Sequence, residues 1–254
     1  MFQLNNKIAL VTGGGSGIGK EVCKVLAKQG AHVIVVDLNA DSAKGTIDEI
    51  TSNGNTAEVL TLDVTNQGTV TTAFEKLKSL DILVNCAGIS HIGSATTTNE
   101  ADFEKVFQVN VKGVYNCLQA GLNVMKKSGG GSIVNISSIA AKVGLSDRFA
   151  YSMSKGAVHA MTMSVAKDYI KDNIRCNSVS PGRVHTPFVD GFLKKNYPGQ
   201  EAEMFEKLSK TQPIGRMGLP IEVAHQVLYL CSEEAAFITG SDFSIDGGFV
   251  TLNS

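Results

Sequence analysis

The sequence contains no tryptophan and only five prolines and five cysteines among its 254 residues. The cysteines (Cys23, Cys86, Cys117, Cys176 and Cys231) are odd in number and widely spaced, without a paired motif. This pattern predicts free thiols and favours neither a disulfide framework nor a zinc site. The five histidines show no His-Glu-x-x-His or similar ligand spacing, so we expect no metal.

Basic tracts and long apolar runs are also absent. The 23 lysines and arginines balance 24 acidic residues and are scattered, which argues against a nucleic acid partner. No segment approaches the roughly 20 consecutive apolar residues that span a bilayer. The first residues contain no hydrophobic signal region either. We therefore expect no membrane association and a cytoplasmic location.

Short apolar, β-branched runs alternate with longer segments of helical periodicity along the whole chain. Runs that are apolar on both faces must be covered on both faces, which predicts a parallel sheet with helices above and below it. We expect a single α/β domain over residues 1–254, with a doubly wound (Rossmann) seven-stranded sheet. The expected strands are Ile8–Thr12, His32–Asp37, Val59–Val64, Ile82–Asn85, Ile133–Ser137, Cys176–Ser180 and Phe243–Asp246.

One stretch, from Arg183 to Leu219, breaks this alternation. It contains three of the five prolines and a short amphipathic piece from Glu201 to Leu208. Long excursions in compact α/β domains are usually lids or disordered segments. We interpret residues 183–219 as a substrate lid.

A glycine-rich segment follows the first expected strand and opens a helix. Glycines at such a turn let backbone N–H groups approach a pyrophosphate at the positive end of the helix. The residues expected to bind a dinucleotide here are Gly13, Gly15, Ser16, Gly17, Ile18 and Gly19.

The second expected strand ends at Asp37, 18 residues beyond Gly19. This is close to the spacing of the acid that binds a ribose 2′-hydroxyl. The carboxylate would repel a 2′-phosphate, and Leu38 supplies no compensating cation. Asp37 and Leu38 together predict a preference for NAD(H) over NADP(H).

Tyr151 and Lys155 are four residues apart, and Ser138 precedes the tyrosine by thirteen. Positions i and i+4 share one helix face, so the ammonium ion can stabilise the phenolate form of the tyrosine. Ser138 follows an apolar run and would lie at a strand tip, where its hydroxyl can polarise a carbonyl oxygen. The three residues indicate proton-transfer chemistry.

The order and spacing of several motifs resemble the short-chain dehydrogenase/reductase family over nearly the whole chain. Thr12 to Gly19 match its glycine motif, and Asn85-Cys86-Ala87-Gly88 match its Asn-Asn-Ala-Gly segment with one change. The family's helical asparagine falls at Asn110, and its Tyr-x-x-x-Lys at Tyr151 and Lys155. Further expected cofactor contacts are Asp63, Val64, Asn85, Ala87, Gly88, Pro181, Gly182, Val184 and Thr186, besides Tyr151 and Lys155.

The resemblance implies a role for each catalytic residue. Tyr151 would be the general acid/base, and Lys155 would stabilise its anion and bind the nicotinamide ribose. Ser138 would orient the carbonyl. Asn110 would interrupt its helix, so that a main-chain carbonyl holds a water in a proton relay to Lys155. These residues imply an NAD(P)-dependent oxidoreductase.

The substrate is less constrained. Two arginines and two histidines would approach the pocket next to Ser138 and Tyr151. The arginines are Arg148, three residues before Tyr151, and Arg183, directly after Pro181-Gly182. The histidines are His91 and His185. Arginine binds carboxylates in a bidentate way. The position of Arg148 is similar to that of an arginine in short-chain 3-hydroxybutyrate and 2-keto-3-deoxy-sugar-acid dehydrogenases. A small polar, anionic substrate is therefore our hypothesis; the alternative is that Arg148 points into solvent.

We expect an NAD(H)-dependent enzyme that interconverts a secondary alcohol and a ketone on a sugar acid, sugar or hydroxy/oxo acid. One alternative is a 3-oxoacyl-(acyl-carrier-protein) reductase, against which Asp37 argues. A second alternative, from another class, is a non-catalytic NAD-binding sensor or scaffold, against which the complete catalytic set argues.

The helix beginning near Tyr151 is apolar on more than one face, which exceeds what packing on one sheet requires. The excess predicts a subunit interface. The family commonly associates through this helix and the one that holds Asn110, so we expect a homotetramer.

Overall fold

The computed structural model describes residues 1–252, apart from the side chain of Asn196, and within this range the strands form one parallel seven-stranded sheet, as expected. Its order is β3-β2-β1-β4-β5-β6-β7. Connectivity reverses between β1 and β4, and ligands of such sheets bind beside this switch point at the carboxyl ends of the strands. The strands are β1 (Ile8–Thr12), β2 (His32–Asp37), β3 (Ala57–Thr61), β4 (Ile82–Asn85), β5 (Gly131–Ile136), β6 (Ile174–Pro181) and β7 (Asp242–Ile245).

Strand β3 differs from its prediction. It begins at Ala57 and ends at Thr61, rather than running from Val59 to Val64. Thr61 pairs with Asp37, the last residue of β2, so the ladder has no partner for later residues. As an edge strand β3 is largely exposed, whereas Leu62 and Val64 beyond its end are 7% and 8% exposed. The apolar run that predicted this strand also includes the buried residues of the turn that follows it.

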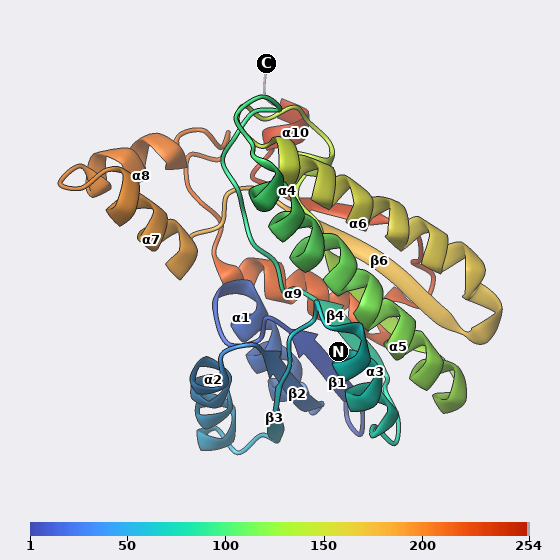
Figure 1. Cartoon of the computed structure of the whole chain (residues 1–254). Helices are drawn as coiled ribbons and strands as arrows, with labels where there is room; N and C mark the ends of the chain where they lie inside the picture. Colours follow the sequence, from blue (N-terminus) through green and yellow to red (C-terminus); the bar gives the residue numbers. More distant parts are fainter. Residues whose placement is uncertain (253–254) are drawn as a thin grey trace.

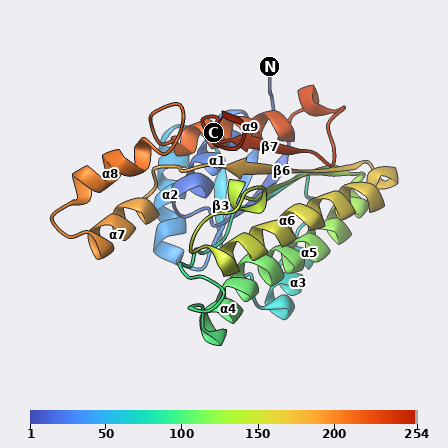
Figure 2. The same cartoon turned by 90° about the horizontal axis from the view of Figure 1, so that it is seen from above.

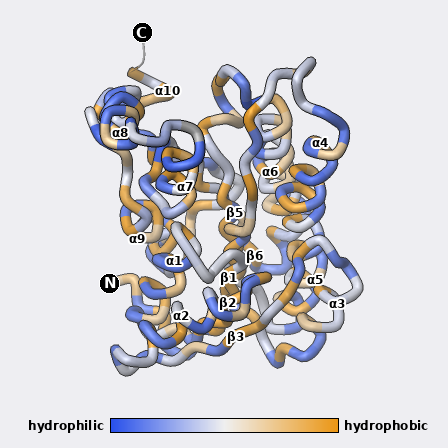
Figure 3. The backbone as a smooth tube through the Cα atoms, turned by 60° about the vertical axis from the view of Figure 1, so that its left-hand side comes forward, coloured by the Kyte–Doolittle hydropathy of each residue, from blue (hydrophilic) through white to orange (hydrophobic). Residues whose placement is uncertain are grey.

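Helices cover both faces of the sheet, as Figure 2 shows from above. One face packs against α1 (Gly17–Lys28), α2 (Ala40–Ser52) and α9 (Pro220–Cys231). The other packs against α3 (Gln67–Glu75), α5 (Gly113–Ser128) and α6 (Phe149–Asp168), with α4 (Glu100–Phe107) against α6. Each face has its own apolar core, and in Figure 3 hydrophobic stretches gather along the central strands.

Short segments complete the chain. A π-helical turn, η1 (Gln108–Lys112), joins α4 to α5, and η2 (Ile139–Ala141), η3 (Ile170–Asp172) and η4 (Glu233–Ala235) are 3₁₀ turns. The last described residues form α10 (Phe249–Leu252). Among the helices of residues 1–252, none is both long enough and apolar enough to cross a bilayer.

The expected excursion over residues 183–219 contains two helices that extend from the body of the molecule (Figure 1). Helix α8 (Glu201–Ser209) corresponds to the predicted amphipathic piece. Helix α7 (Pro187–Asn196) was not predicted; Pro187 occupies its first turn, where an N–H is not needed. Val189, Leu193 and Met217 are buried between these helices in a separate small core.

The excursion is anchored where it returns to the sheet. Arg216 donates two hydrogen bonds to the carboxylate of Glu222, at 2.6 and 2.8 Å. Glu222 also accepts a bond from Leu219 N–H at the start of α9. The Arg216 bonds, with that amide, lower the pKa of Glu222 to about 2. Because both side chains are substantially exposed, solvent screens the pair and it adds little stability.

Candidate functional site

A cleft of about 660 Å³ lies at the carboxyl ends of the strands and contains most of the residues selected from the sequence. Its walls include Gly13, Ser16, Gly17, Ile18, Gly19, Asp37, Leu38, Asp63, Val64, Ala87, Gly88, Ser138, Arg148, Tyr151, Lys155, Pro181, Gly182, Arg183, Val184 and Thr186. Five selected residues do not line it: Gly15, Asn85, His91, Asn110 and His185. Chain segments far apart in sequence thus converge on one site.

The glycine-rich turn has a shape that only glycine permits at two positions. Gly13 has a φ of +68°, and a Cβ there would lie 2.9 Å from Ala87. A Cβ on Gly19 would lie 2.1 Å from the carbonyl oxygen of Gly13. Helix α1 begins after Ser16 without a side-chain cap, so its first N–H groups remain available. An uncapped helix start beside a cleft fits a pyrophosphate.

Asp37 holds the turn from the end of β2. Its Oδ2 accepts from Gly15 N–H at 3.0 Å, and its Oδ1 accepts from Asn39 N–H at 2.9 Å. Each carboxylate oxygen can accept a further hydrogen bond. Leu38 beside it is 71% exposed. This part of the cleft therefore offers a carboxylate as a hydrogen-bond acceptor, and the residue next to it is an apolar leucine.

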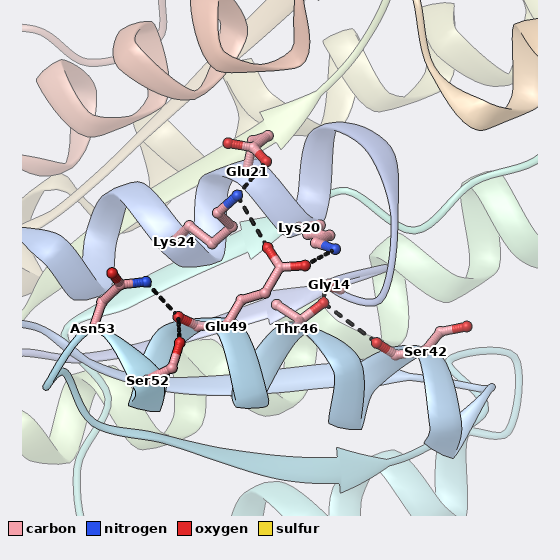
Figure 4. A network of polar contacts seen from close by, with 9 residues as sticks. All are labelled: Gly14, Lys20, Glu21, Lys24, Ser42, Thr46, Glu49, Ser52 and Asn53. Atoms are coloured by element: carbon pink, nitrogen blue, oxygen red, sulfur yellow. Dashed lines mark hydrogen bonds and ion pairs between the residues drawn. The ribbon is translucent and has the colours of Figure 1, made fainter.

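A polar network ties α2 to α1 behind the glycine turn (Figure 4). The hydroxyl of Thr46, fully buried, donates to the carbonyl of Gly14 at 2.9 Å. Glu49 lies between Lys20 and Lys24, at 2.6 and 3.2 Å. The hydrogen bond from Lys20 lowers the pKa of Glu49. The hydrogen bond that Lys24 donates to Glu21 raises the pKa of Lys24. The turn is thus supported from a second helix.

Buried side chains fix the ends of β1, β4 and β5. Thr12 Oγ1 accepts from the N–H groups of Cys86 and Ala87, each at 3.1 Å. Asn85 donates to Asn135 Oδ1 at 2.8 Å, and both residues are at most 2% exposed. Asn85 was selected as a cofactor contact. The structure instead places its side chain behind the cleft wall, where it joins β4 to β5.

Tyr151 and Lys155 lie on α6, and both face the cleft. Lys155 is 6% exposed; its Nζ donates to Ile136 carbonyl at 2.8 Å and lies 5.8 Å from the centroid of the Tyr151 ring. Ser137 Oγ donates to Lys155 carbonyl at 3.1 Å, which joins α6 to the end of β5. The ammonium ion is close enough to act on a charge at the phenol.

The interruption expected at Asn110 is present as the π-helical turn η1. The Asn110 amide donates to Ile89 carbonyl at 2.8 Å and to Ser154 Oγ at 3.0 Å, and its oxygen accepts from Ile89 N–H at 2.8 Å. These three bonds connect the segment after β4 with α6. The side chain is fully engaged, so any relay at this position involves the main chain.

Ser138 lies between β5 and η2 and is 8% exposed. Its Oγ accepts from Ala140 N–H at 3.1 Å and thereby caps η2. A hydroxyl that accepts a hydrogen bond can still donate its own proton. The Ser138 hydroxyl can therefore donate into the cleft that it lines.

Two arginines also line the cleft. Arg148 donates to Ser90 Oγ and to His91 carbonyl, at 3.3 and 3.2 Å, so it does not simply extend into solvent. Arg183 Nε is buried and has no hydrogen-bond partner among the described residues. Burial lowers the pKa of Arg183, and the charge of Arg148 lowers it further. Within residues 1–252 neither arginine forms an ion pair.

The two histidines selected with these arginines lie outside the cleft wall. His91 contributes its carbonyl to Arg148, and its Nε2 is buried without a described partner. His185 lies 2.7 Å from Asp190 and packs edge-on against Phe205, with ring centroids 4.9 Å apart. It therefore contacts α7 and α8 rather than the cleft.

Sequence reasoning missed several residues of the cleft wall. Gln212 is 3% exposed and accepts from Arg183 N–H at 3.3 Å. It lies at the end of the excursion, where no motif marks it. Other missed residues include Ile89, Ser90, Lys105, Leu145, Phe188, Val189 and Phe249.

Comparisons with known proteins identify chains that are similar over nearly the whole length. A family model described as enoyl-(acyl carrier protein) reductase matches residues 13–250. Cyclopentanol dehydrogenase from Comamonas sp. (strain NCIMB 9872) is 38% identical, over 98% of this chain and 99% of that protein. 2-Keto-3-deoxy-L-fuconate dehydrogenase from Xanthomonas campestris pv. campestris is 36% identical, over 97% and 81%. A structure of 7α-hydroxysteroid dehydrogenase complexed with NADH and 7-oxo glycochenodeoxycholic acid has a TM-score of 0.88 and 33% identity, covering 97% and 95%.

The Thr46 contact generates a prediction about dinucleotide affinity. Thr46→Val keeps the shape of the side chain but leaves the Gly14 carbonyl without its buried donor. Without this bond the glycine turn is held less firmly in the shape that would receive the pyrophosphate, so we expect NADH to bind about tenfold more weakly. Fluorescence titration of NADH measures this. Thr51→Val, which removes an exposed hydroxyl bonded within the same helix, is the matched control; equal affinities of the two variants would contradict the role of Thr46.

Proposed function

Because the chain belongs to the short-chain dehydrogenase/reductase family, whose members are NAD(P)-dependent oxidoreductases of CH–OH groups, we propose that it acts with NAD(H) on a small anionic substrate. The substrate class is a hydroxy acid, or a keto acid derived from a carbohydrate. The relatives named as dehydrogenases support the interconversion of an alcohol and a ketone.

The observation behind the substrate class is the pair of arginines in the cleft. Arg148 and Arg183 share the wall that contains Tyr151 and Lys155, and Arg183 Nε has no described partner. Two neighbouring guanidinium groups without a carboxylate favour a bound anion, which would supply both the charge and the acceptors. The related 2-keto-3-deoxy-L-fuconate dehydrogenase is named for such an acid.

Tyr151 is the proposed general acid and base. In the reducing direction its hydroxyl donates a proton to the substrate's carbonyl oxygen, and the ammonium of Lys155, 5.8 Å from the ring centroid, stabilises the resulting phenolate. Ser138 donates a hydrogen bond to the same oxygen and polarises the carbonyl. Asn110 holds the segment after β4 beside this group. In the oxidising direction the proton returns to Tyr151.

The nicotinamide cofactor supplies or accepts the hydride when it is bound. The uncapped start of α1 would hold its pyrophosphate, and Asp63 and Val64 would border the adenine. Val184 and Thr186 would hold the carboxamide. Asp37 would accept from the adenosine ribose, and its charge would disfavour a 2′-phosphate, so we propose NAD(H) as the preferred cofactor.

Residues 183–219 are proposed as a lid. Phe188, Val189 and Gln212 come from this segment and line the cleft, while Arg216 and Glu222 anchor its far end. A segment attached at both ends and bearing wall residues can close over a substrate and exclude water.

Association into a homotetramer is proposed as well. Large apolar side chains are exposed on α4, α5 and α6, all on one side of the sheet: Phe107 36%, Tyr115 45%, Phe149 47% and Met163 46%. Adjacent exposed apolar groups of this size mark interaction surfaces. A second copy of the chain, with the same surface, would cover them.

The proposed activity is tested by measuring initial rates at 340 nm with NADH or NADPH. The ketone panel contains a 2-keto-3-deoxy sugar acid, acetoacetate, cyclopentanone and a 3-oxoacyl thioester. We expect turnover of an acid with NADH in preference to NADPH. Turnover of the thioester alone with NADPH would favour the 3-oxoacyl reductase alternative, and bound NADH without any turnover would favour the sensor.

The arginine pair gives a more specific prediction. Replacing Arg148 or Arg183 with Met removes one guanidinium and its hydrogen bonds to the acid, at a cost of about 1.5–3 kcal/mol. We expect KM for the acid to rise at least about tenfold, while KM for cyclopentanone changes less than about twofold. Steady-state kinetics on both ketones provides the comparison. An unchanged KM for the acid would show that the substrate's charge is not recognised here.

The assembly state can be measured directly. We expect light scattering coupled to gel filtration to give four times the mass of the chain. Replacing Met163 with Glu places a charge on the exposed apolar surface and should reduce the mass, because a buried unpaired charge opposes association. A monomer mass for the unmodified chain would exclude the tetramer.

A further inference from the structure

Outside the cleft wall, an ion pair connects the turn after β5 to the edge strand of the sheet. Lys142 Nζ lies 2.5 Å from Asp242 Oδ2, and the two side chains are 25% and 5% exposed. Lys142 directly follows η2, and Asp242 opens β7. Neither residue lines the cleft. The role proposed above for the site uses neither of them.

The carboxylate of Asp242 is also bonded to the neighbouring strand. Its Oδ1 accepts from Ser178 Oγ at 2.5 Å and from Ser180 Oγ at 2.8 Å, and both serines of β6 are fully buried. Lys142 Nζ donates to Ser244 Oγ of β7 at 2.8 Å. Its contact with Asp242 Oδ2 is a charge contact, since that oxygen has no aligned hydrogen bond among the described residues. One network therefore joins η2, β6 and β7.

The network holds two segments that enter the cleft. Ser138 caps the start of η2, and Lys142 caps its end, so the ion pair fixes the turn at the end opposite Ser138. Ser180 directly precedes Pro181 and Gly182, which line the cleft. This partly buried ion pair is weak evidence for stability, because apolar residues of similar volume often stabilise a fold as well. Its geometric effect is to set the position of η2 relative to β6 and β7.

We propose that Lys142 and Asp242 are positioning residues that hold the Ser138 hydroxyl in its orientation toward the substrate's carbonyl. Neither residue touches substrate or cofactor; both act through the 3₁₀ turn and strand β6. This inference rests on the proposed function, since it assigns a consequence to the role of Ser138. Loss of the ion pair should also loosen the turn itself, whether or not a substrate is bound.

Hydrogen exchange tests the claim about the turn. Four amides of residues 140–143 bond within the turn, to Ser138 or to Ile139. In Lys142→Met we expect the peptide spanning residues 137–143 to exchange at least about tenfold faster, because the turn loses its anchor. Lys142→Arg keeps the cation and should restore slow exchange. Lys7→Met, which breaks a pair with Asp81 at the amino end of the sheet, should leave this peptide unchanged.

Lys142→Met leaves a buried carboxylate without its cation and can therefore fail to fold. The double variant Lys142→Met with Asp242→Asn removes both charges and keeps an acceptor for the two serines. It should show the same fast exchange in residues 137–143. Wild-type exchange in this folded double variant would overturn the proposal.

A double-mutant cycle tests the consequence for catalysis, with acetoacetate as the substrate, or cyclopentanone if the acid is not turned over. We expect the loss of Lys142 to lower kcat about tenfold in the wild-type background and less than about twofold in Ser138→Ala, with KM for NADH unchanged. Equal losses in both backgrounds would contradict positioning through Ser138 alone. An unaffected kcat in Ser138→Ala would instead contradict the role proposed for the serine.

Discussion

The buried ammonium ion of Lys155 is the group around which the cleft is organised. It is 6% exposed, it donates to the Ile136 carbonyl at the end of β5, and it forms no ion pair among the described residues. A buried cation of this kind is costly unless nearby dipoles or anions stabilise it. The strand-end carbonyl supplies part of that stabilisation, and an anion forming at Tyr151 would supply more. The energetic requirement of the lysine and the chemistry of the tyrosine therefore support each other.

The parallel sheet accounts for the position of the other groups. All strands end on the same side, so Asp37, Asn85, Ser138 and Pro181, which follow or end four different strands, are brought to one edge. The cleft wall then carries charges of both signs, from Asp37 and Asp63 and from Lys155, Arg148 and Arg183. Buried amides and hydroxyls such as Thr12 and Asn135 fix the strand ends from behind. Rigid strand ends carry the site, and longer connections complete its wall.

The sequence predicted those parts of the fold and the site that depend on residues close together in the chain. The strands β1, β2 and β4 were predicted to the residue, because their limits follow from local apolar runs between turns. The glycine turn and the Tyr151–Lys155 pair depend on short spacings and were found together in the cleft. The side-chain roles of Asn85 and His185 could not be predicted, because they depend on Asn135, 50 residues away, and on Phe205 in another helix. Gln212 and Lys142 likewise act through partners that only the folded chain brings near.

The arginines remain as the part of the site that the fold does not explain. Arg183 is half-buried, with its Nε fully buried, and lies near a second positive charge. Both effects lower its pKa, so its charged form is destabilised by the folded chain alone. A neutral side chain at this position would avoid the cost of removing a charge from water. Side chains that destabilise the fold and have no compensating partner in the protein are expected at functional sites. A bound carboxylate would provide the missing charge and the acceptor for Arg183 Nε at once. The unfavourable placement of this guanidinium is thus itself an argument for an anionic substrate.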